Sequence, residues 1–256
     1  MYKVSEIYDY INSIAPFNTQ EEWDNSGLLV GDLNGNVTKI AVALDITQAA
    51  ITTAKKLGAE LIVSHHPVIF KAQKQFRVGN LAYELAAAGI SALCAHTNLD
   101  AAEGGVSDVL AQRLGLHDIF PVSMSDAPVP MLRMGEVEDI PMQPSEFAQS
   151  VKEKLNCTMV RYVAGRQAVR SVVVCGGAGC SLLDEAISLG ADAFVTGDAS
   201  HHDFLNAAEA GITLVAAGHF NTEDVVIEPL AKKLAENFRE AKIIRLMQKD
   251  PVSYAI

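Results

Sequence analysis

The feature that most constrains the fold is an internal repeat of short apolar segments followed by polar strand ends. Three segments of the first half recur in the same order in the second half. The matched pairs are Ile40–Ala43 with Val172–Cys175, Leu57–Ser64 with Leu189–Thr196, and Ala88–Ser91 with Ala210–Thr213. The letters LGA and AGI alone would mark ordinary helix ends. Their shared order favours a duplicated unit.

Within the first copy, apolar runs typical of buried strands alternate with helix-forming stretches that end at glycine. This alternation is typical of a parallel sheet with helices on its faces. The predicted strands are Lys39–Leu44, Leu61–Ser64, Ser91–Ala95, Met131–Val137, Thr158–Val163 and Ile243–Met247. The predicted helices are Val4–Ile14, Thr47–Leu57, Leu81–Ala88, Glu146–Leu155 and Asp224–Arg239.

The sequence therefore predicts an α/β protein in which a duplicated α/β unit forms two similar lobes, with a metal site in the cleft between them. We expect residues 1–125 to form the first lobe, completed by the C-terminal residues 225–256. Residues 126–224 are expected to form the second lobe. The segment 121–170 has more proline and a less regular pattern, and we interpret it as an addition to the second lobe.

Histidines stand where predicted strands end. His65 and His66 follow the apolar run Leu61–Ser64, and Pro67 biases His66 toward an extended conformation. Neutral imidazole is the commonest metal ligand, and the carboxyl edge of an α/β sheet is where ligands bind. A lone histidine after a strand is as often a structural residue. Several of them at equivalent strand ends favour a metal site.

Each copy also ends in a histidine followed four residues later by a carboxylate: His96 with Asp100, and His219 with Glu223. The candidate metal ligands are His65, His66, Asp100, His219 and Glu223. This set suits Zn, Fe, Mn, Co or Ni. If one carboxylate bridges, it can hold two divalent ions with coordination positions open to water.

Other polar groups have less specific patterns. His96 is a candidate catalytic residue as a proton shuttle, and its alternative is a group that supports the metal ligands. His202 is a candidate as a proton donor or a substrate contact. The alternative for His201-His202-Asp203 is a solvated first helical turn with Ser200 as N-cap, and His117 is expected on the surface. The turn Gly176–Gly179 either is a tight turn without a ligand or presents backbone N–H groups to a phosphate.

Composition excludes several classes of function. With 20 Lys and Arg against 31 Asp and Glu, the net charge is −11, so a nucleic-acid partner is not expected. The sequence has no membrane-spanning apolar run and no signal-like start, which predicts a cytoplasmic protein. The four cysteines, Cys94, Cys157, Cys175 and Cys180, lie in no CxxC pattern and are expected to be reduced and buried.

Several motifs together resemble the NIF-three-like dinuclear-metal family, whose bacterial members are commonly labelled GTP cyclohydrolase I type 2 homologues. The resemblance spans nearly the whole chain. Its motifs are Trp23–Leu28 (WDNSGL), His65–Pro67 (HHP), Thr97–Asp100 (TNLD), Cys175–Gly179 (CGGAG), Thr196–Asp198 (TGD) and Gly218–Glu223 (GHFNTE).

The resemblance implies two related α/β lobes, a toroidal homohexamer and two metal ions in the cleft. By motif, His66 and Asp100 would bind one ion, His65 and His219 the other, and Glu223 would bridge. The family label implies hydrolytic opening of the guanine imidazole ring of GTP, so a nucleotide or another phosphate-containing small molecule is the expected ligand. The alternatives are hydrolysis of a phosphate ester, a metal-binding or metal-delivery protein without catalysis, and a ring-shaped scaffold for a protein partner.

Overall fold

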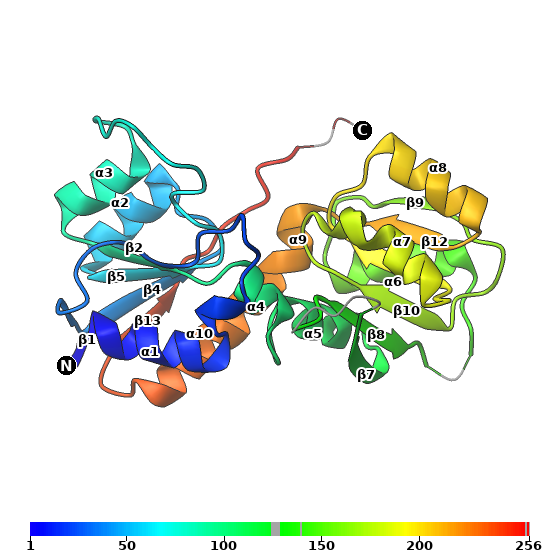
Figure 1. Ribbon diagram of the computed structural model, residues 1–256, viewed down its shortest axis with the longest axis horizontal. Helices are drawn as coiled ribbons and strands as arrows, with labels where there is room; N and C mark the ends of the chain where they lie inside the picture. The colour runs from blue at the N-terminus through cyan, green and yellow to red at the C-terminus, as the bar shows by residue number, and fades with distance from the viewer. Residues whose placement is uncertain (124–128, 139, 254, 256) are drawn as a thin grey trace. The chain divides into compact units, whose positions relative to one another are not determined.

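The computed structural model describes residues 1–123, 129–138, 140–253 and 255, and confirms the predicted α/β class. The chain forms two compact units, each built around its own sheet (Figure 1). Unit 1 comprises Met1–Ala102 and Ile227–Gln248, and unit 2 comprises Glu103–Val226 and Lys249–Ile256. Within the described ranges, no helix is both long and apolar enough to cross a membrane.

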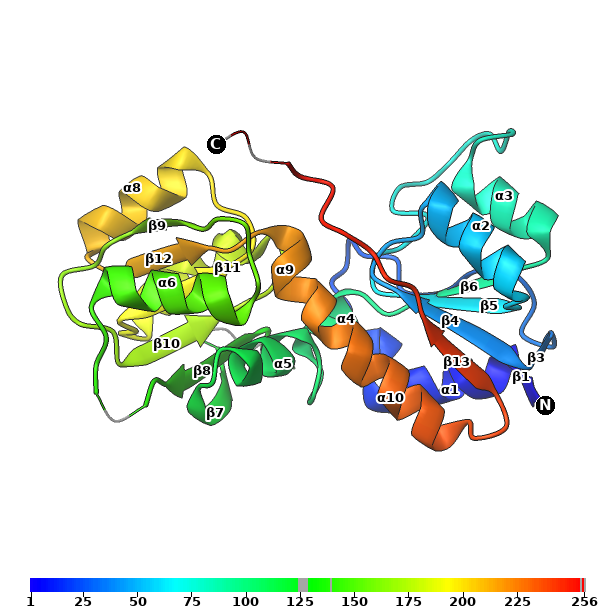
Figure 2. The same ribbon diagram turned by 180° about the vertical axis from the view of Figure 1, so that it is seen from behind.

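Unit 1 contains a five-stranded sheet in the order β13-β4-β5-β6-β2. Its strands are β13 (Lys242–Arg245), β4 (Lys39–Ala43), β5 (Leu61–Ser64), β6 (Ser91–Cys94) and β2 (Gly27–Val30). All are parallel to their neighbours except β2, which pairs antiparallel with β6. From behind, β13 is seen beside β4, although the two are far apart in sequence (Figure 2). A separate ladder joins β1 (Tyr2–Lys3) to β3 (Asn36–Val37).

Helices cover both faces of this sheet, with α2 and α3 on one side and α1 and α10 on the other (Figure 1). The helices of unit 1 are α1 (Val4–Ile14), α2 (Gln48–Leu57), α3 (Leu81–Ala88), α4 (Thr97–Ala101) and α10 (Ile227–Asn237), with a 3-10 turn at Phe17–Thr19. Ile51 of α2 and Leu85 of α3 pack against Ile62 of β5 in one apolar core. Burial on both faces explains why these strands are continuous apolar runs.

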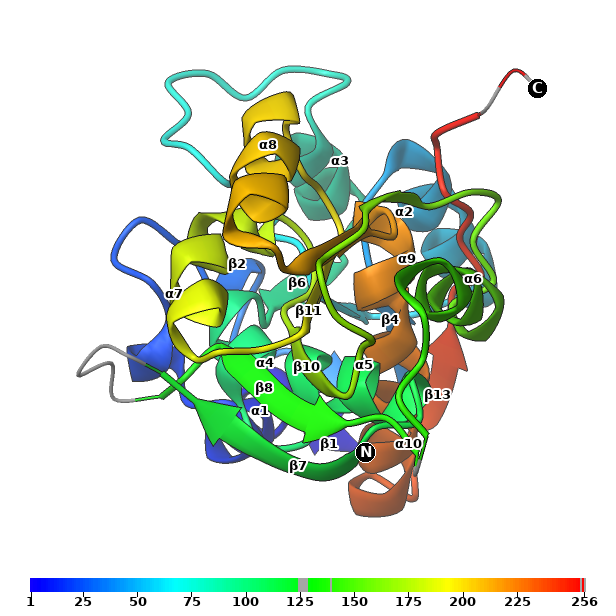
Figure 3. The same cartoon turned by 90° about the vertical axis from the view of Figure 1, so that its right-hand side faces the viewer.

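Unit 2 contains a six-stranded sheet in the order β7-β8-β10-β11-β12-β9. Its strands are β7 (His117–Val122), β8 (Leu132–Glu136), β10 (Ser171–Val174), β11 (Ala193–Thr196), β12 (Thr213–Ala216) and β9 (Arg161–Val163). The central β10, β11 and β12 are parallel, whereas β8, β7 and β9 join antiparallel. The antiparallel pair β7 and β8 is visible at one edge in Figure 3.

Alternate residues of these strands enter two different cores. Val173 and Phe194 pack with α7 and α8, whereas Val172 and Val195 pack with α5 and α6. This period of two is the geometry of a pleated strand. The helices of unit 2 are α5 (Val106–Arg113), α6 (Pro144–Lys154), α7 (Leu183–Ser188), α8 (His201–Ala210) and α9 (His219–Glu223), with 3-10 turns at Gly179–Leu182 and Asp224–Val226.

The repeated segments pair in the same register in both sheets. In unit 1, Ile40 lies opposite Leu61, which lies opposite Ser91. In unit 2 the matched residues, Val172, Ala193 and Thr213, lie opposite one another in the same way. This shared register supports the duplication, which stays a prediction.

The structure differs from the sequence expectations mainly between the repeats. Unit 2 begins at Glu103 and includes β7, which pairs with β8 in its sheet. The lobe bounds expected from the sequence, 1–125 and 126–224, stay a prediction. The sequence pattern also gave no indication of α5 or the edge strand β2. The predicted strand at Met131–Val137 and helix at Glu146–Leu155 correspond to β8 and α6.

Glu60 ties the start of β5 to the start of β4. Its carboxylate accepts hydrogen bonds from the Lys39 N–H at 2.9 Å and from the N–H and hydroxyl of Thr38 at 3.2 and 2.9 Å. Burial alone would raise the pKa of Glu60, but these hydrogen bonds outweigh it and lower the pKa. The ionised form is therefore the one that stabilises the fold.

We predict that Glu60→Gln lowers the free energy of unfolding by about 1–2 kcal/mol at neutral pH, because an uncharged amide cannot accept all these bonds. A lowered pKa stabilises the fold above the pKa of the unfolded carboxyl, about 4.3, and that stability is lost as the pH falls through the folded value. In urea unfolding, the midpoint of the variant should therefore be lower than that of the native protein at pH 7. The two midpoints should be equal under strongly acidic conditions. Glu209→Gln, at an exposed position of α8, is the control. Equal midpoints of Glu60→Gln and native protein at pH 7 would contradict this.

Candidate metal centre

Three imidazoles gather at the carboxyl edge of the sheet in unit 1. His65 and His66 follow β5, and His96 follows β6. Each ring offers a nitrogen, and these nitrogens all lie within 4.8 Å of one another. Parallel pairing explains the cluster, because the ends of neighbouring parallel strands meet at one edge. The structure thus brings together two predicted ligands and His96, which the sequence had assigned a catalytic role.

Each of these rings is held by a hydrogen bond at Nδ1. His65 Nδ1 lies 2.9 Å from the Ala95 carbonyl oxygen, and His66 Nδ1 lies 2.8 Å from Asp45 Oδ1. A carbonyl oxygen only accepts, so the proton of the neutral His65 ring is on Nδ1 and the lone pair is on Nε2. A metal-binding histidine almost always has this arrangement, with its other ring nitrogen bonded to a carboxylate or a carbonyl.

His65 is fully buried, and its Nε2 faces Asp100, a residue of the short helix α4. The distance from His65 Nε2 to Asp100 Oδ1 is 3.5 Å. Two ligand atoms that share one ion at about 2.1 Å in tetrahedral geometry stand about 3.4 Å apart. The donor types and their separation therefore fit one shared divalent ion, whereas the family resemblance assigns Asp100 to the ion of His66 and His65 to the other ion.

His96 is oriented by Asp24, whose side chain is buried. Asp24 Oδ1 lies 2.7 Å from His96 Nδ1, and its Oδ2 accepts from the Thr97 N–H at 3.0 Å and from the Thr97 hydroxyl. Burial would raise the pKa of Asp24, but the hydrogen bonds from His96 and Thr97 hold that pKa well below its usual range. Asp24 is thus a permanent carboxylate that fixes the His96 ring.

The same network fixes the backbone around His96. The Ser26 hydroxyl accepts from the His96 N–H at 3.1 Å and donates to Asn98 Oδ1 at 2.8 Å. Asn98 in turn donates to the Ala15 carbonyl at 2.6 Å. The WDNSG segment therefore shapes the start of α4, which also carries Asp100.

In unit 2, His219 and Glu223 lie one turn apart on α9. His219 Nδ1 lies 2.7 Å from Asp198 Oδ2, and its Nε2 lies 3.0 Å from Glu223 Oε2. The ring is therefore held by a carboxylate on one side and faces a second carboxylate on the other, whereas in unit 1 the ring that faces a carboxylate, His65, is held by a carbonyl. Glu223 is only 4% exposed.

The glycine turn after β10 surrounds the Glu223 carboxylate. Gly177 has φ +58°, and a Cβ added there would lie 1.9 Å from Glu223 Oε1. The Gly177 N–H donates to the Thr222 hydroxyl at 3.0 Å, and its carbonyl accepts from the N–H groups of Gly197 and Asp198, each at 2.9 Å. These bonds occupy the Gly177 backbone within the protein. The turn therefore lies against the Glu223 carboxylate and limits the space around it.

The remaining histidines have other surroundings. His201 and His202 are exposed on the first turn of α8, where Ser200 is the N-cap and forms a capping box with Asp203. Among the described residues, His202 belongs to no cluster of possible metal ligands. His117 is exposed on β7, as expected.

The cysteines are all thiols. Cys94, Cys157 and Cys175 are buried, and Cys180 is half-buried. Cys94 Sγ donates to the His65 carbonyl oxygen at 3.0 Å, and burial raises its pKa well above the usual value. Burial also raises the pKa of Cys180 to about 12. The Cys94 and Cys180 thiols therefore remain protonated at neutral pH.

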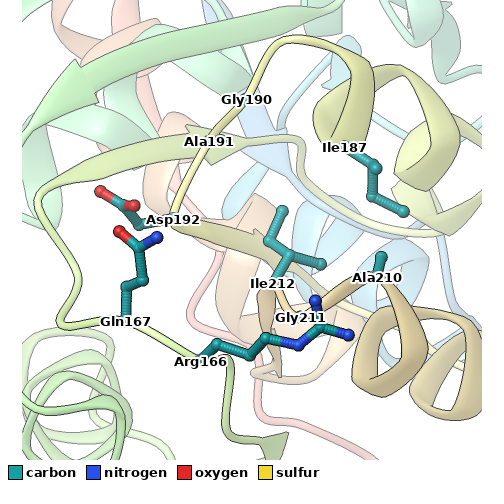
Figure 4. Close-up of a pocket in the computed structure, with 9 residues that line it drawn as sticks. All are labelled: Arg166, Gln167, Ile187, Gly190, Ala191, Asp192, Ala210, Gly211 and Ile212. Atoms are coloured by element: carbon teal, nitrogen blue, oxygen red, sulfur yellow. The ribbon is translucent and has the colours of Figure 1, made fainter.

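A shallow pocket in unit 2 is lined in part by Arg166, Asp192 and Gly211 (Figure 4). It lies at the amino ends of β11 and β12, whereas Asp198 and His219 follow the carboxyl ends of these strands. The Arg166 guanidinium donates to the Glu209 carbonyl at 2.6 Å, and Asp192 accepts from Arg170 and Ser171. Arg166 and Asp192 are thus engaged within the protein, and the pocket is not part of the candidate metal centre.

A model of the family Duf34/NIF3 (NGG1p interacting factor 3) matches residues 2–251 of the chain. The chain belongs to the Duf34/NIF3 family. A Clostridium perfringens protein described as "GTP cyclohydrolase 1 type 2 homolog" is 32% identical, over 98% of this chain and 99% of that protein.

Solved structures show the same fold. The Staphylococcus aureus hypothetical protein SA1388 has a TM-score of 0.91 and 30% identity, covering 99% of each chain. Reduced HcgD from Methanocaldococcus jannaschii has a TM-score of 0.81 and 28% identity, covering 96% of this chain and 98% of that one. These full-length matches confirm the family that the motifs indicated.

The three carboxylates that hold the imidazoles were not assigned a role from the sequence. Asp24 lies within the WDNSG motif, Asp45 follows β4, and Asp198 takes the place of His66 in the second copy. A position just after a parallel strand is the signal that could have identified Asp45 and Asp198. The role of Asp24 depends on long-range contacts, which one sequence does not reveal.

We predict that Gly177→Ala reduces the bound metal, because the new methyl group would displace the Glu223 carboxylate. Gly190→Ala is a matched control, since Gly190 also has a positive φ, +72°, but a Cβ there would meet no atom within 4 Å. In both variants, backbone strain should lower the free energy of unfolding by about 1–2 kcal/mol. Only Gly177→Ala should lose metal in elemental analysis, and equal metal content in the two variants would contradict the steric argument.

Proposed function

We propose that the protein is a metal-dependent hydrolase with a dinuclear centre formed by His65, His66, Asp100, His219 and Glu223. The observation that carries the proposal is the hydrogen bond at Nδ1 of each histidine ligand. His65 is held by a carbonyl, and His66 and His219 are held by Asp45 and Asp198. Metal-binding histidines almost always have this arrangement, and it recurs at all three histidines of the proposed set.

The proposed centre takes its ligands from the carboxyl strand ends of both copies of a duplicated α/β unit. Asp100 and Glu223 each follow a histidine by four residues, and each is buried. Glu223 is the proposed bridging carboxylate. Divalent ions bound there would supply Lewis-acid activation of water and of the substrate. Zn, Fe, Mn, Co and Ni all suit this mixture of imidazole and carboxylate.

His96 is the proposed proton-transfer group. Its Nδ1 is held by the ionised Asp24, so Nε2 is the ring nitrogen that would give or take a proton. Its side chain is only 13% exposed, so the proton would pass to a bound molecule more readily than to bulk water. His202 stays a weaker candidate, on the exposed first turn of α8.

The named reaction is a GTP cyclohydrolase 1 type 2-like hydrolysis, in which water opens the imidazole ring of guanine by breaking C–N bonds. The description of the Clostridium perfringens relative supports this choice. The proposal includes a ring of six copies in the cytoplasm, which rests on the family resemblance. A phosphate ester is the second substrate class to test.

Metal content tests the ligand assignment. We expect His65→Ala to lower bound metal by about one ion per chain, because the buried Nε2 that faces Asp100 would be lost. The measurement is elemental analysis of the purified protein, with circular dichroism to show that the fold persists. His117→Ala removes an exposed imidazole from the surface strand β7 and is the control. A folded His65→Ala protein with unchanged metal content would reject the assignment.

Turnover tests the enzymatic proposal. Metal-replete protein should hydrolyse GTP or a generic phosphodiester, and Glu223→Gln should lower kcat by about 100-fold, a loss typical of damage to a metal centre. Glu209→Gln changes an exposed glutamate of α8 in the same way and should keep full activity. Bound metal without turnover of either substrate would overturn the hydrolase proposal in favour of a metal-binding protein.

A further inference from the structure

Two aromatic side chains are exposed beside His96 in unit 1. Trp23 is 58% exposed and Phe70 is 46% exposed. Their ring centroids are 5.7 Å apart, and they lie 6.1 and 6.2 Å from the His96 ring, respectively. Exposed aromatic side chains that lie together can form a binding surface.

The loop that carries Phe70 is basic. Residues 67–80 connect the HHP motif to α3 and include Lys71, Lys74 and Arg77 but no acidic residue. All three basic side chains are exposed. The chain as a whole has a net charge of −11, so this loop is a local exception. It extends from the sheet edge that carries His65 and His66 (Figure 1).

One hydrogen bond joins the loop to the segment that carries Trp23, and another lies within the loop. Asn25 Nδ2 donates to the Ile69 carbonyl oxygen at 2.6 Å. At the other end of the loop, Asn80 Nδ2 donates to Gln73 Oε1 at 2.7 Å. Asp24, between Trp23 and Asn25, is the carboxylate that holds His96. The backbone on either side of the two aromatic residues is thus tied to groups that lie next to the imidazole.

We propose that Trp23 and Phe70 form a stacking platform for a planar heteroaromatic base and that Lys71, Lys74 and Arg77 attract its phosphates. The ligand class is therefore a nucleotide, with its base beside His96. Stacking on an aromatic face recognises a base, and exposed cations recognise phosphate. This inference rests on the proposed function where it makes the bound nucleotide the substrate. Binding to the platform requires no turnover.

The protein provides its own reporter, because Trp23 is its only tryptophan. The experiment titrates the full chain, as purified with its metals and again after chelation, with GTP, guanosine and inorganic triphosphate. A stacked base should quench the fluorescence of Trp23. We expect quenching by GTP and guanosine in both preparations and none by triphosphate. Equal quenching by triphosphate, or none by GTP, would overturn the platform.

Substitutions test the contribution of the ring. Trp23→Ala should weaken GTP binding about tenfold by calorimetry, the scale of one base–aromatic stack. Trp23→Phe keeps an aromatic face and should recover most of the affinity. Phe120→Ala removes an aromatic residue that is 49% exposed on β7 and should bind GTP normally. Unchanged affinity of Trp23→Ala would reject the proposal.

The charges are tested by replacing Lys71, Lys74 and Arg77 together with alanine. Binding of GTP should weaken at least tenfold and lose much of its salt dependence, whereas guanosine binding should not change. A variant that binds GTP as the native protein does would reject the role of the loop.

The two proposals fail in different ways. Quenching without any turnover would support the platform and reject the hydrolase. Turnover of GTP with the same KM in Trp23→Ala would support the hydrolase and reject the platform.

Discussion

Parallel pairing of three consecutive strands is the constraint on which the candidate site depends. In each unit these strands run in sequence order across the middle of the sheet, so their carboxyl ends meet at one edge. The residue after each strand is then fixed near its counterparts on the neighbouring strands. His65 and His96 meet in this way in unit 1, and Asp198 meets His219 in unit 2.

The sequence was sufficient to predict the parallel strands and the positions at their ends. Apolar runs such as Leu61–Ser64 have the length of a buried strand and are followed by polar residues. The pattern therefore predicts both the strand and the position where it ends. The shared order of the repeated segments also matches the pairing register of both sheets. The α/β class and the family were accordingly within reach of the sequence.

Features that depend on long-range contacts could not be predicted from the sequence. β7 is an exposed edge strand containing Pro121, so it lacks the apolar run that identifies the central strands. Asp24 lies 72 residues before the imidazole that it orients. Gly177 appeared to be one of several glycines in a turn, and only the structure shows that its hydrogen atom leaves room for Glu223. Steric and hydrogen-bonding roles of this kind have no local periodicity.

The hydrogen bonds at Nδ1 have a consequence for the thermodynamics of metal capture. A side chain that rotates freely must lose conformational entropy when it binds an ion, and that loss weakens the affinity. The rings of His65, His66 and His219 are already restrained by their partners, so the loss occurs when the chain folds. If these rings form the proposed centre, such preorganisation would favour tight binding of the metal.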